Sequence, residues 1–357
     1  LRARHIAYTI TEVTPKYLII ATKQPVDSAA IMQQLGGTVK ISERYETKLK
    51  QAQAILKLLT KPGKIEFSIS GPGAERLAIA IKKNLKSRGY SVRYIPAKNT
   101  ATILHNKLVE GGTDFTLLNS NLYITKAIQP IAAFATRDYG RPRADSASGL
   151  LPPKLARLMV NLAEAEPTAT LLDPFCGSGT ILVEALSLGF KNIIGSDLSA
   201  KATADTQKNL TWFRDNHIAI QPYSHSIRIF PSDVRDLTKH LKPNSVDIIV
   251  TEPYLGRPLH GNETKDFLLR QAAELRNLYC SAFTTFSSIL KSKGTVIFII
   301  PQFKHKTDWV MIDAVPDIKK IGFTPIPLLP GKISLLYARP QQYLGRMIWK
   351  LKENHKQ

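Results

Sequence analysis

The segment Leu-Leu-Asp-Pro-Phe-Cys-Gly-Ser-Gly-Thr, residues 171–180, constrains the fold of this chain more than any other feature. It has the pattern of a buried strand that ends in a glycine-rich turn and leads into a helix. In an open α/β sheet, ligands bind at such a strand end. Gly177 and Gly179 allow the backbone to turn tightly and to approach a ligand closely. The segment therefore predicts an α/β sheet with a binding site at the turn.

The kind of ligand follows from what surrounds the two glycines. The segment lacks the third glycine of a dinucleotide-binding fingerprint and the Gly-Lys-Ser/Thr of a phosphate-binding loop. Asp173, just before the turn, would repel a pyrophosphate but can accept a hydrogen bond from an ammonium group. This acid favours a ligand of the methionine type. Cys176 has no evident histidine partner in the sequence, so we interpret it as a small packing residue rather than a nucleophile.

Strand-like and helix-like segments alternate around this turn. Apolar runs predict strands, and a 3.6-residue periodicity predicts helices. The expected strands are residues 170–172, 193–196, 226–230, 246–250 and 295–300, and the expected helices are residues 155–165, 179–189 and 264–290. This alternation is typical of a doubly wound parallel sheet, an α/β Rossmann-like fold. Residues 334–338 and 343–350 instead predict a C-terminal hairpin that adds an antiparallel strand.

Two further acids follow the next predicted strands. Asp197 lies 24 residues after Asp173, near the spacing at which an acid accepts both ribose hydroxyls of a nucleoside cofactor. Asp233 follows the third strand, where it is placed to accept a hydrogen bond from an adenine amino group. Each acid alone is equally compatible with a helix cap. Three acids at successive strand ends favour an adenosine-containing ligand.

The length of 357 residues and a hydrophobic content of 43% predict two folded domains, each with its own core. In the N-terminal part, residues 6–20 and 64–70 indicate strands, and residues 27–35 and 75–87 indicate helices. The first of these helices is expected to be capped by Asp27 and ended by Gly36-Gly37. The buried face of the second helix is expected to carry Leu77, Ala80, Ile81 and Leu85. Residues 136–150 are rich in turn formers and charge, which is typical of a linker. The predicted organisation is an α+β domain over residues 1–135, a linker over 136–150 and the α/β domain over 151–357.

The formal net charge of +21 indicates a polyanionic partner, because so many cations repel one another without one. Residues 1–150 contain 23 Lys and Arg against 10 Asp and Glu, and residues 151–357 contain 26 against 18. The N-terminal part is therefore expected to bind nucleic acid. The alternatives are a basic surface that only keeps the protein soluble and an anionic membrane surface as the partner.

The cysteine content and the apolar stretches limit which cellular compartments and which kinds of site fit this chain. Two cysteines, Cys176 and Cys280, exclude a disulfide framework and a four-cysteine zinc site, and they suit a reducing cytoplasm. No metal is expected. The longest apolar stretches fall far short of the roughly 20 residues that a membrane-spanning helix needs. The first residues, Leu-Arg-Ala-Arg-His, have no apolar region or cleavage site, so no signal peptide is predicted. The missing initiator methionine is compatible with a truncated start.

The fourth predicted strand runs into Thr251-Glu252-Pro253-Tyr254. An enzyme that methylates a planar amino nitrogen must bind both N–H groups and hold the extruded base, because the nitrogen lone pair is delocalised into the ring. Tyr254 offers an aromatic face. A backbone carbonyl near Glu252 or Pro253, and a side-chain oxygen of Thr251 or Glu252, offer the acceptors. The alternative is a loop in which the proline and the tyrosine only pack.

With these motifs the chain resembles the tRNA guanosine N2-methyltransferases of archaea and eukaryotes. That family joins an N-terminal THUMP-type RNA-binding region to a Rossmann-like amino-methyltransferase domain of the UPF0020 type. The resemblance is carried by Arg-Asp-Tyr-Gly-Arg-Pro (137–142), Gly-Leu-Leu-Pro-Pro-Lys-Leu-Ala-Arg (149–157), Asp-Pro-Phe-Cys-Gly-Ser-Gly-Thr (173–180) and Tyr-Leu-Gly-Arg (343–346). The THUMP-type resemblance lies over about residues 50–130.

The resemblance implies an enzyme that transfers a methyl group from S-adenosylmethionine to the N2 amino group of a guanosine in tRNA. The catalytic residues that it implies are Thr251, Glu252, Pro253 and Tyr254. The cofactor-binding residues that it implies are Asp173, Pro174, Phe175, Cys176, Gly177, Gly179, Thr180, Asp197, Leu198, Asp233 and Val234.

One departure from the family bears on the chemistry. The usual catalytic motif is Asp-Pro-Pro-Tyr, and this chain has Thr-Glu-Pro-Tyr at 251–254. A threonine hydroxyl is a weaker acceptor than a carboxylate, so either Glu252 takes over the role, the rate is low, or the substrate has changed. Rival hypotheses are an amino-methyltransferase acting on rRNA, DNA or a protein glutamine, and an inactive RNA-binding partner subunit. The sequence leaves open the modified position, mono- or dimethylation, the oligomeric state and the need for a small activator subunit.

Overall fold

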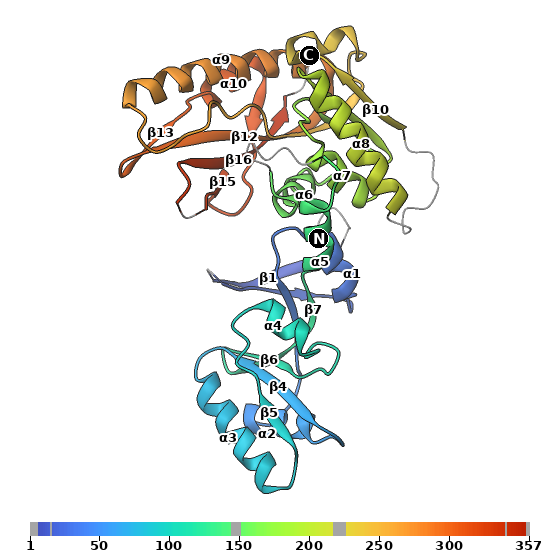
Figure 1. The fold of residues 1–357 in the computed structure, drawn as a ribbon, viewed down its shortest axis with the longest axis vertical. Coiled ribbons are helices and arrows are strands. Elements are labelled where there is room, and N and C mark those ends of the chain that lie inside the picture. The colour runs from blue at the N-terminus through green and yellow to red at the C-terminus, as the bar shows by residue number, and fades with distance from the viewer. Residues whose placement is uncertain (1–5, 15, 144–150, 217–225, 340, 355–357) are drawn as a thin grey trace. The chain divides into compact units, whose positions relative to one another are not determined.

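The computed structural model describes residues 6–14, 16–143, 151–216, 226–339 and 341–354 (Figure 1). The chain separates into two compact units, Ile6–Ala133 and Phe134–Gln357. Helix α5 (Ile131–Tyr139) covers the start of the predicted linker, and residues 144–150 of that linker lie outside the described residues. The predicted boundaries at residues 135 and 150 stay a prediction.

The first unit holds a hairpin and a mixed sheet. β1 (Tyr8–Val13) and β2 (Leu18–Thr22) pair in antiparallel fashion. The mixed sheet has the order β3-β7-β6-β4-β5, with the bounds Lys40–Arg44, Asn121–Ile128, Asp114–Leu118, Ile65–Ser70 and Val92–Tyr94. The helices are α1 (Ser28–Gln34), α2 (Gln51–Leu59), α3 (Ala74–Ser87) and α4 (Thr100–His105). The predicted α+β character of this unit is confirmed.

Local sequence explains where α1 begins. The Asp27 carboxylate accepts hydrogen bonds from the N–H groups of Ala29 and Ala30, both over 2.9 Å, and so satisfies two donors that the helix leaves without partners. The helix ends at Gln34, just before the Gly36-Gly37 pair that was expected to stop it. The predicted cap at Asp27 is therefore confirmed.

The buried face of α3 differs from the predicted one at one position. The residues that α3 buries are Ala74, Ala78, Ile81 and Leu85, and Leu77 is half-buried. Ala80 was expected on this face and is exposed. Successive residues of a helix are rotated by about 100°, so Ala80 lies to one side of the row that Ile81 continues. The prediction for Ala80 was wrong because the apolar stripe is narrower than the run of apolar residues.

The second unit is built on a sheet of order β10-β9-β8-β11-β12-β16-β14, with β13 paired to β12 and β15 paired to β16. The strand bounds are β8 Thr170–Asp173, β9 Asn192–Asp197, β10 Ser226–Pro231, β11 Val246–Thr251, β12 Leu290–His305, β13 Asp308–Met311, β14 Phe323–Pro325, β15 Ser334–Tyr337 and β16 Leu344–Glu353. The strands from β10 to β12 are parallel, and β16 is antiparallel to β12. Strand order reverses between β8 and β11, and open α/β sheets bind their ligands at such a point.

Two apolar clusters lie on opposite faces of this sheet. α6 (Pro153–Leu162), α7 (Thr180–Ser187) and α8 (Ala200–Asn216) contribute to one, and α9 (Lys265–Ile289), α10 (Val315–Ile321) and the 3₁₀ helix η2 (Val234–Lys239) contribute to the other. Along β11, Ile249 packs in the α9 cluster, whereas Ile248 and Val250 pack in the α7 cluster, as the alternation of side chains in a strand requires. Burial on both faces explains why these strands are continuous apolar runs.

The predicted α/β Rossmann-like sheet with a C-terminal antiparallel hairpin is confirmed (Figure 1). Two strands extend well beyond their predicted ends. β12 extends from Leu290 to His305 instead of 295–300, and β16 extends to Glu353 instead of residue 350. β12 pairs with β11, β13 and β16 along different parts of its length, so cross-strand pairing carries it beyond its apolar run.

Candidate active site

Asp173 and Thr251 are the last residues of the neighbouring strands β8 and β11, where the strand order reverses. The Thr251 hydroxyl donates a hydrogen bond to Oδ1 of Asp173 over 2.6 Å, and the Phe175 N–H donates to the same oxygen over 3.2 Å. Both acid and hydroxyl are buried, with 1% of Asp173 and 0% of Thr251 exposed. Within the described residues, no hydrogen bond reaches Oδ2 of Asp173. One oxygen of a buried carboxylate is thus left for a further donor.

Burial raises the pKa of the Asp173 carboxyl to about 7. The hydrogen bonds from Thr251 and Phe175 lower this pKa, and the nearby carboxylates of Asp197 and Glu252 add to the rise. A cation placed against Asp173 would favour the ionised form and reverse part of the rise. The strand end is therefore chemically suited to an ammonium group.

The glycine-rich turn between β8 and α7 presents part of its backbone to open space. Gly177 and Gly179 have φ values of +52° and +85°, in the left-handed region that favours glycine. A Cβ on Gly177 would meet no heavy atom within 4 Å, whereas one on Gly179 would lie 3.0 Å from Thr206. The Thr206 hydroxyl donates to the Gly177 carbonyl over 2.7 Å and so holds the turn. A ligand has room against Gly177, and Gly179 is needed for packing.

The other members of the turn are largely buried. Cys176 donates its N–H to the Ser196 carbonyl over 2.9 Å, and burial raises the pKa of its thiol. A thiol in this state is not a nucleophile near neutral pH, which supports the interpretation of Cys176 as a packing residue. Pro174 and Thr180 are buried, and Phe175 is half-buried against the α9 cluster.

Asp197 ends β9 and reaches the same turn. Its Oδ2 accepts from the Gly177 N–H over 3.0 Å, and its Oδ1 accepts from the Ser199 N–H over 2.9 Å. A carboxylate has about four lone-pair sites, so acceptor capacity remains. The next residue, Leu198, has 75% of its surface exposed. This arrangement fits a nucleoside, because Asp197 can accept hydrogen bonds from the ribose and the base can pack on Leu198.

Asp233 serves the protein itself. It is the N-cap of η2 and accepts from the Arg235 N–H over 2.9 Å, and its carboxylate also binds Nε and Nη2 of Arg235 over 2.9 and 2.5 Å. The Arg235 guanidinium lowers the pKa of Asp233. Val234 is buried in the α9 cluster. The structure thus realises the helix-cap alternative at this acid, and an adenine amino group would share the carboxylate with Arg235.

Tyr254 is the exposed member of the motif at 251–254. It has 55% of its surface exposed, and Pro253 before it is buried. The backbone carbonyl of Tyr254 accepts a hydrogen bond from the Tyr279 hydroxyl over 2.8 Å, which fixes the loop to α9. An exposed aromatic ring on a fixed backbone, shortly after the end of β11, suits stacking on a planar base.

Glu252 forms an ion pair with Arg346 of β16. The Arg346 Nε donates to Oε1 of Glu252 over 2.6 Å, and only 8% and 13% of the two side chains are exposed. Burial raises the pKa of Glu252, and the Arg346 charge and hydrogen bond oppose that rise. Sequence reasoning placed Arg346 in the family-like segment 343–346 but did not assign it to the site. The structure therefore separates two neighbours, with Thr251 bound to Asp173 and Glu252 bound to Arg346.

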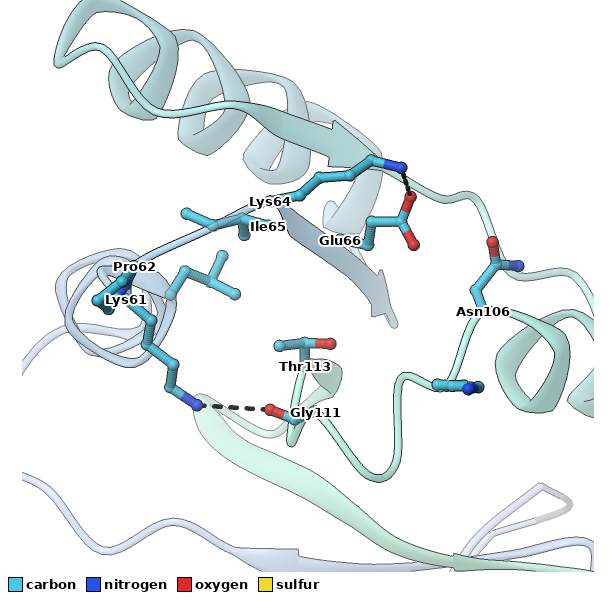
Figure 2. Close-up of a pocket in the computed structure, with 10 residues that line it drawn as sticks. Lys61, Pro62, Lys64, Ile65, Glu66, Asn106, Gly111 and Thr113 are labelled. Atoms are coloured by element: carbon cyan, nitrogen blue, oxygen red, sulfur yellow. Dashed lines mark hydrogen bonds and ion pairs between the residues drawn. The ribbon is translucent and has the colours of Figure 1, made fainter.

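A hollow lies in the first unit, at the start of β4 (Figure 2). It has a volume of about 260 Å³ and three of its lining residues are Lys61, Lys64 and Lys107. Lys64 pairs with Glu66 over 2.7 Å, and the Lys61 ammonium donates to the Gly111 carbonyl over 3.4 Å, as Figure 2 shows. No ion pair to Lys107 occurs among the described residues. The positive charge of the N-terminal part thus gathers partly around this hollow.

Two classes of feature are absent from the part of the chain that the structure describes. It brings together no group of three His, Cys, Asp or Glu side chains able to hold a metal ion. None of its helices has the length and apolar content to cross a membrane.

Comparison with known proteins places the domain. Residues 140–315 match the model of a family described as UPF0020: RMKL-like, methyltransferase domain. The tRNA (guanine(10)-N2)-dimethyltransferase of Methanothermobacter thermautotrophicus is 39% identical over 108 residues, which are 30% of this chain and 28% of the relative. The enzyme of the same description from Methanocaldococcus jannaschii is 37% identical over 156 residues, 43% of this chain and 38% of the relative. The match thus spans less than half of the length of each of these relatives.

Among solved structures, the crystal structure of TrmN from Thermus thermophilus aligns with a TM-score of 0.52 at 17% identity, over 94% of this chain and 88% of that chain. This likeness shows a shared fold. On the family match, residues 140–315 of this chain are a methyltransferase domain of the UPF0020 family.

Proposed function

We propose that this protein transfers a methyl group from S-adenosylmethionine to the exocyclic N2 amino group of a guanosine in tRNA. The observation that carries the proposal is the exposed ring of Tyr254, which follows Thr251, Glu252 and Pro253 at the end of β11. The names of the two archaeal relatives support the substrate. The basic first unit supports a polyanionic partner, and we propose residues 1–135 as its RNA-binding region.

The residues present fit the cofactor. Asp173 is proposed to hold its ammonium group, because Oδ2 has no partner among the described residues and the raised pKa falls when a cation arrives. Asp197 is proposed to accept from the ribose, and Leu198 to contact the adenine. Gly177 leaves room along the turn. When bound, S-adenosylmethionine supplies a methyl group activated by the adjacent positive sulfur.

On the base side, we propose that Glu252 rather than Thr251 accepts from the guanine amino group. The Thr251 hydroxyl is fully buried and donates its only hydrogen to Asp173. Glu252 keeps acceptor capacity beyond the bond from Arg346. It would take up the proton that the guanine amino nitrogen loses when it is methylated. Tyr254 holds the base by stacking. Most of the rate enhancement therefore comes from positioning the guanine amino nitrogen for methyl transfer.

The test is transfer of labelled methyl from S-adenosylmethionine to total tRNA, ribosomal RNA and duplex DNA in parallel, followed by mass spectrometry of the labelled nucleosides. We expect N2-methylguanosine or N2,N2-dimethylguanosine from tRNA. Label only in ribosomal RNA or DNA would replace the substrate and keep the chemistry. Cofactor binding without label in any pool would favour the inactive partner subunit over the enzyme.

We also propose a cytoplasmic location, which the two free cysteines support.

Different variants should separate the roles of Thr251 and Glu252. Glu252→Gln should lower turnover about 10- to 100-fold with little change in cofactor affinity, because a neutral amide is a weaker acceptor and Arg346 loses its buried counterion. Thr251→Val should instead weaken the binding of S-adenosylhomocysteine near pH 7, because Asp173 loses a hydrogen bond that lowers its pKa. Single-turnover rates and calorimetry measure the two effects.

A surface ion pair of the same unit gives the control for these variants. Arg276 pairs with Asp317 near the surface, with side chains 49% and 24% exposed, and Arg276→Gln should change neither quantity. If Glu252→Gln turned over at the normal rate while Thr251→Val did not, the assignment of the acceptor to Glu252 would be wrong.

A further inference from the structure

A cluster of buried arginines lies beside α7. Arg137 and Arg157 each donate from Nε to the Glu184 carboxylate over 2.6 Å, and Glu184 is fully buried. The Arg157 Nη2 also donates to the Ser187 hydroxyl over 2.5 Å. Arg141 is buried beside them, with 5% of its surface exposed. Three buried guanidinium groups thus accompany one fully buried carboxylate, so the cluster has an excess of positive charge.

Arg141 is only partly satisfied. Its Nη1 donates to the Thr180 hydroxyl over 2.6 Å, but Nε and Nη2 are buried and make no hydrogen bond to any residue that the structure describes. Burial lowers the pKa of Arg141, and the Asp138 and Glu184 charges oppose that change without forming a hydrogen bond to it. Leaving charged donors buried without acceptors is costly, and an anion that accepted from them would offset this cost.

The shape of the free donors defines the anion. Nε–H and Nη2–H are the two parallel donors on one edge of the guanidinium, and they match the two oxygens of a carboxylate or phosphate. The third nitrogen anchors the group to Thr180, the first residue of α7. The first N–H groups of this eight-residue helix have no carbonyl partner within it, and the helix dipole favours an anion at the same end.

We propose that Arg141, together with the N-terminus of α7, binds the α-carboxylate of the methionine part of S-adenosylmethionine. The inference rests on the proposed function for the identity of the ligand. In an amino acid the ammonium and the carboxylate are attached to the same carbon, so the carboxylate lies within a few ångströms of the ammonium partner. Asp173 ends β8, and α7 begins after the turn that follows it, so the proposed ammonium and carboxylate partners flank one glycine-rich turn.

This arrangement would select a zwitterion. Asp173 contacts the ammonium group of the amino acid and Arg141 contacts its carboxylate. A ligand that has neither group therefore makes neither interaction. Since Nε and Nη2 are closed off from solvent, the proposal includes a local shift of the guanidinium toward the ligand, with the bond to Thr180 as its pivot.

Truncating the ligand and the side chain together tests this proposal. Calorimetry would compare S-adenosylhomocysteine, which has the amino and carboxyl groups, with 5′-methylthioadenosine, which has neither. Arg141→Met should weaken the first about 10- to 100-fold, the usual range for hydrogen bonds to a charged group, and change the second by less than about threefold. Arg141→Lys should fall between, because it keeps the charge and loses the parallel donors.

The two ligands also report on folding, because 5′-methylthioadenosine binds only an intact nucleoside site. Equal weakening of both ligands, or no weakening of either, would overturn the role of Arg141. Unchanged affinity for both ligands with weaker binding of tRNA would assign the anion to an RNA phosphate and equally overturn it. If Arg141→Met does not fold, Arg141→Lys alone decides through the same ratio. Failure of the unaltered protein to bind either ligand would count against the proposed function itself.

Discussion

Replacing Tyr254 with alanine should lower turnover about a hundredfold or more, while the affinity for S-adenosylhomocysteine stays within about twofold. Stacking of a base on an aromatic ring contributes about 1–3 kcal/mol, and misplacing the acceptor nitrogen adds a further loss of rate. The ring is exposed, and the loop is held through the Tyr254 backbone carbonyl, which the substitution leaves in place. Single-turnover kinetics on tRNA and calorimetry with S-adenosylhomocysteine measure the two quantities.

Tyr254→Phe is the matched control. It keeps the ring and removes the hydroxyl, so it should retain most of the activity if stacking is the role of this residue. A fully active Tyr254→Ala would contradict stacking, and an inactive Tyr254→Phe would shift the role to the hydroxyl.

Replacing Asp173 with asparagine should weaken S-adenosylhomocysteine about a hundredfold or more at neutral pH, because the ammonium group loses its charged partner. The effect should depend on pH. The pKa of Asp173 is raised to about 7, so the unaltered protein should bind S-adenosylhomocysteine more tightly as pH rises from about 5.5 through 7, where the acid ionises and the ammonium stays charged. The variant should show no such slope. Calorimetry across this range, with 5′-methylthioadenosine as the reference ligand, provides the measurement.

The same pKa shift bears on stability. A carboxyl whose pKa is raised by folding contributes stability that is fully present below its unfolded pKa and is lost as pH rises through its folded pKa. For Asp173 this loss falls between about pH 4 and about pH 7 in the absence of ligand. The stability of Asp173→Asn, measured relative to that of the unaltered protein, should therefore be higher at pH 7 than at pH 4. Thermal unfolding that showed the reverse order would contradict the raised pKa.

The parts of the fold that could be predicted are those that local sequence specifies. Asp173 and Asp197 end apolar runs that β-strands require, and the α9 helix has its apolar face at 3.6-residue spacing. Asp27 was recognisable as a cap because short acids are preferred there. Ala80 was wrongly predicted to be buried, because the sequence pattern does not distinguish an alanine within the buried stripe from one beside it.

The contacts of the site could not be predicted, because they join distant parts of the chain. Arg346 binds Glu252 from 94 residues away, and Thr251 binds Asp173 from 78 residues away. No local pattern specifies such pairs. The pairing of Asp233 with Arg235 is local, but the three acids at successive strand ends led to Asp233 being interpreted as a ligand-binding residue instead. The role of Arg141 depends on which of its nitrogens lack acceptors, which only the packed structure reveals.

The position of β16 has a consequence for synthesis on the ribosome. This strand lies between β12 and β14 and carries Arg346, although it follows both of them in the chain. Until residues 344–353 have left the exit tunnel, the nascent sheet has an unpaired edge at β12, and Glu252 lacks its counterion. The glycine-rich turn is complete much earlier. A nascent chain can therefore form its proposed cofactor site well before its proposed base acceptor, Glu252, gains its counterion.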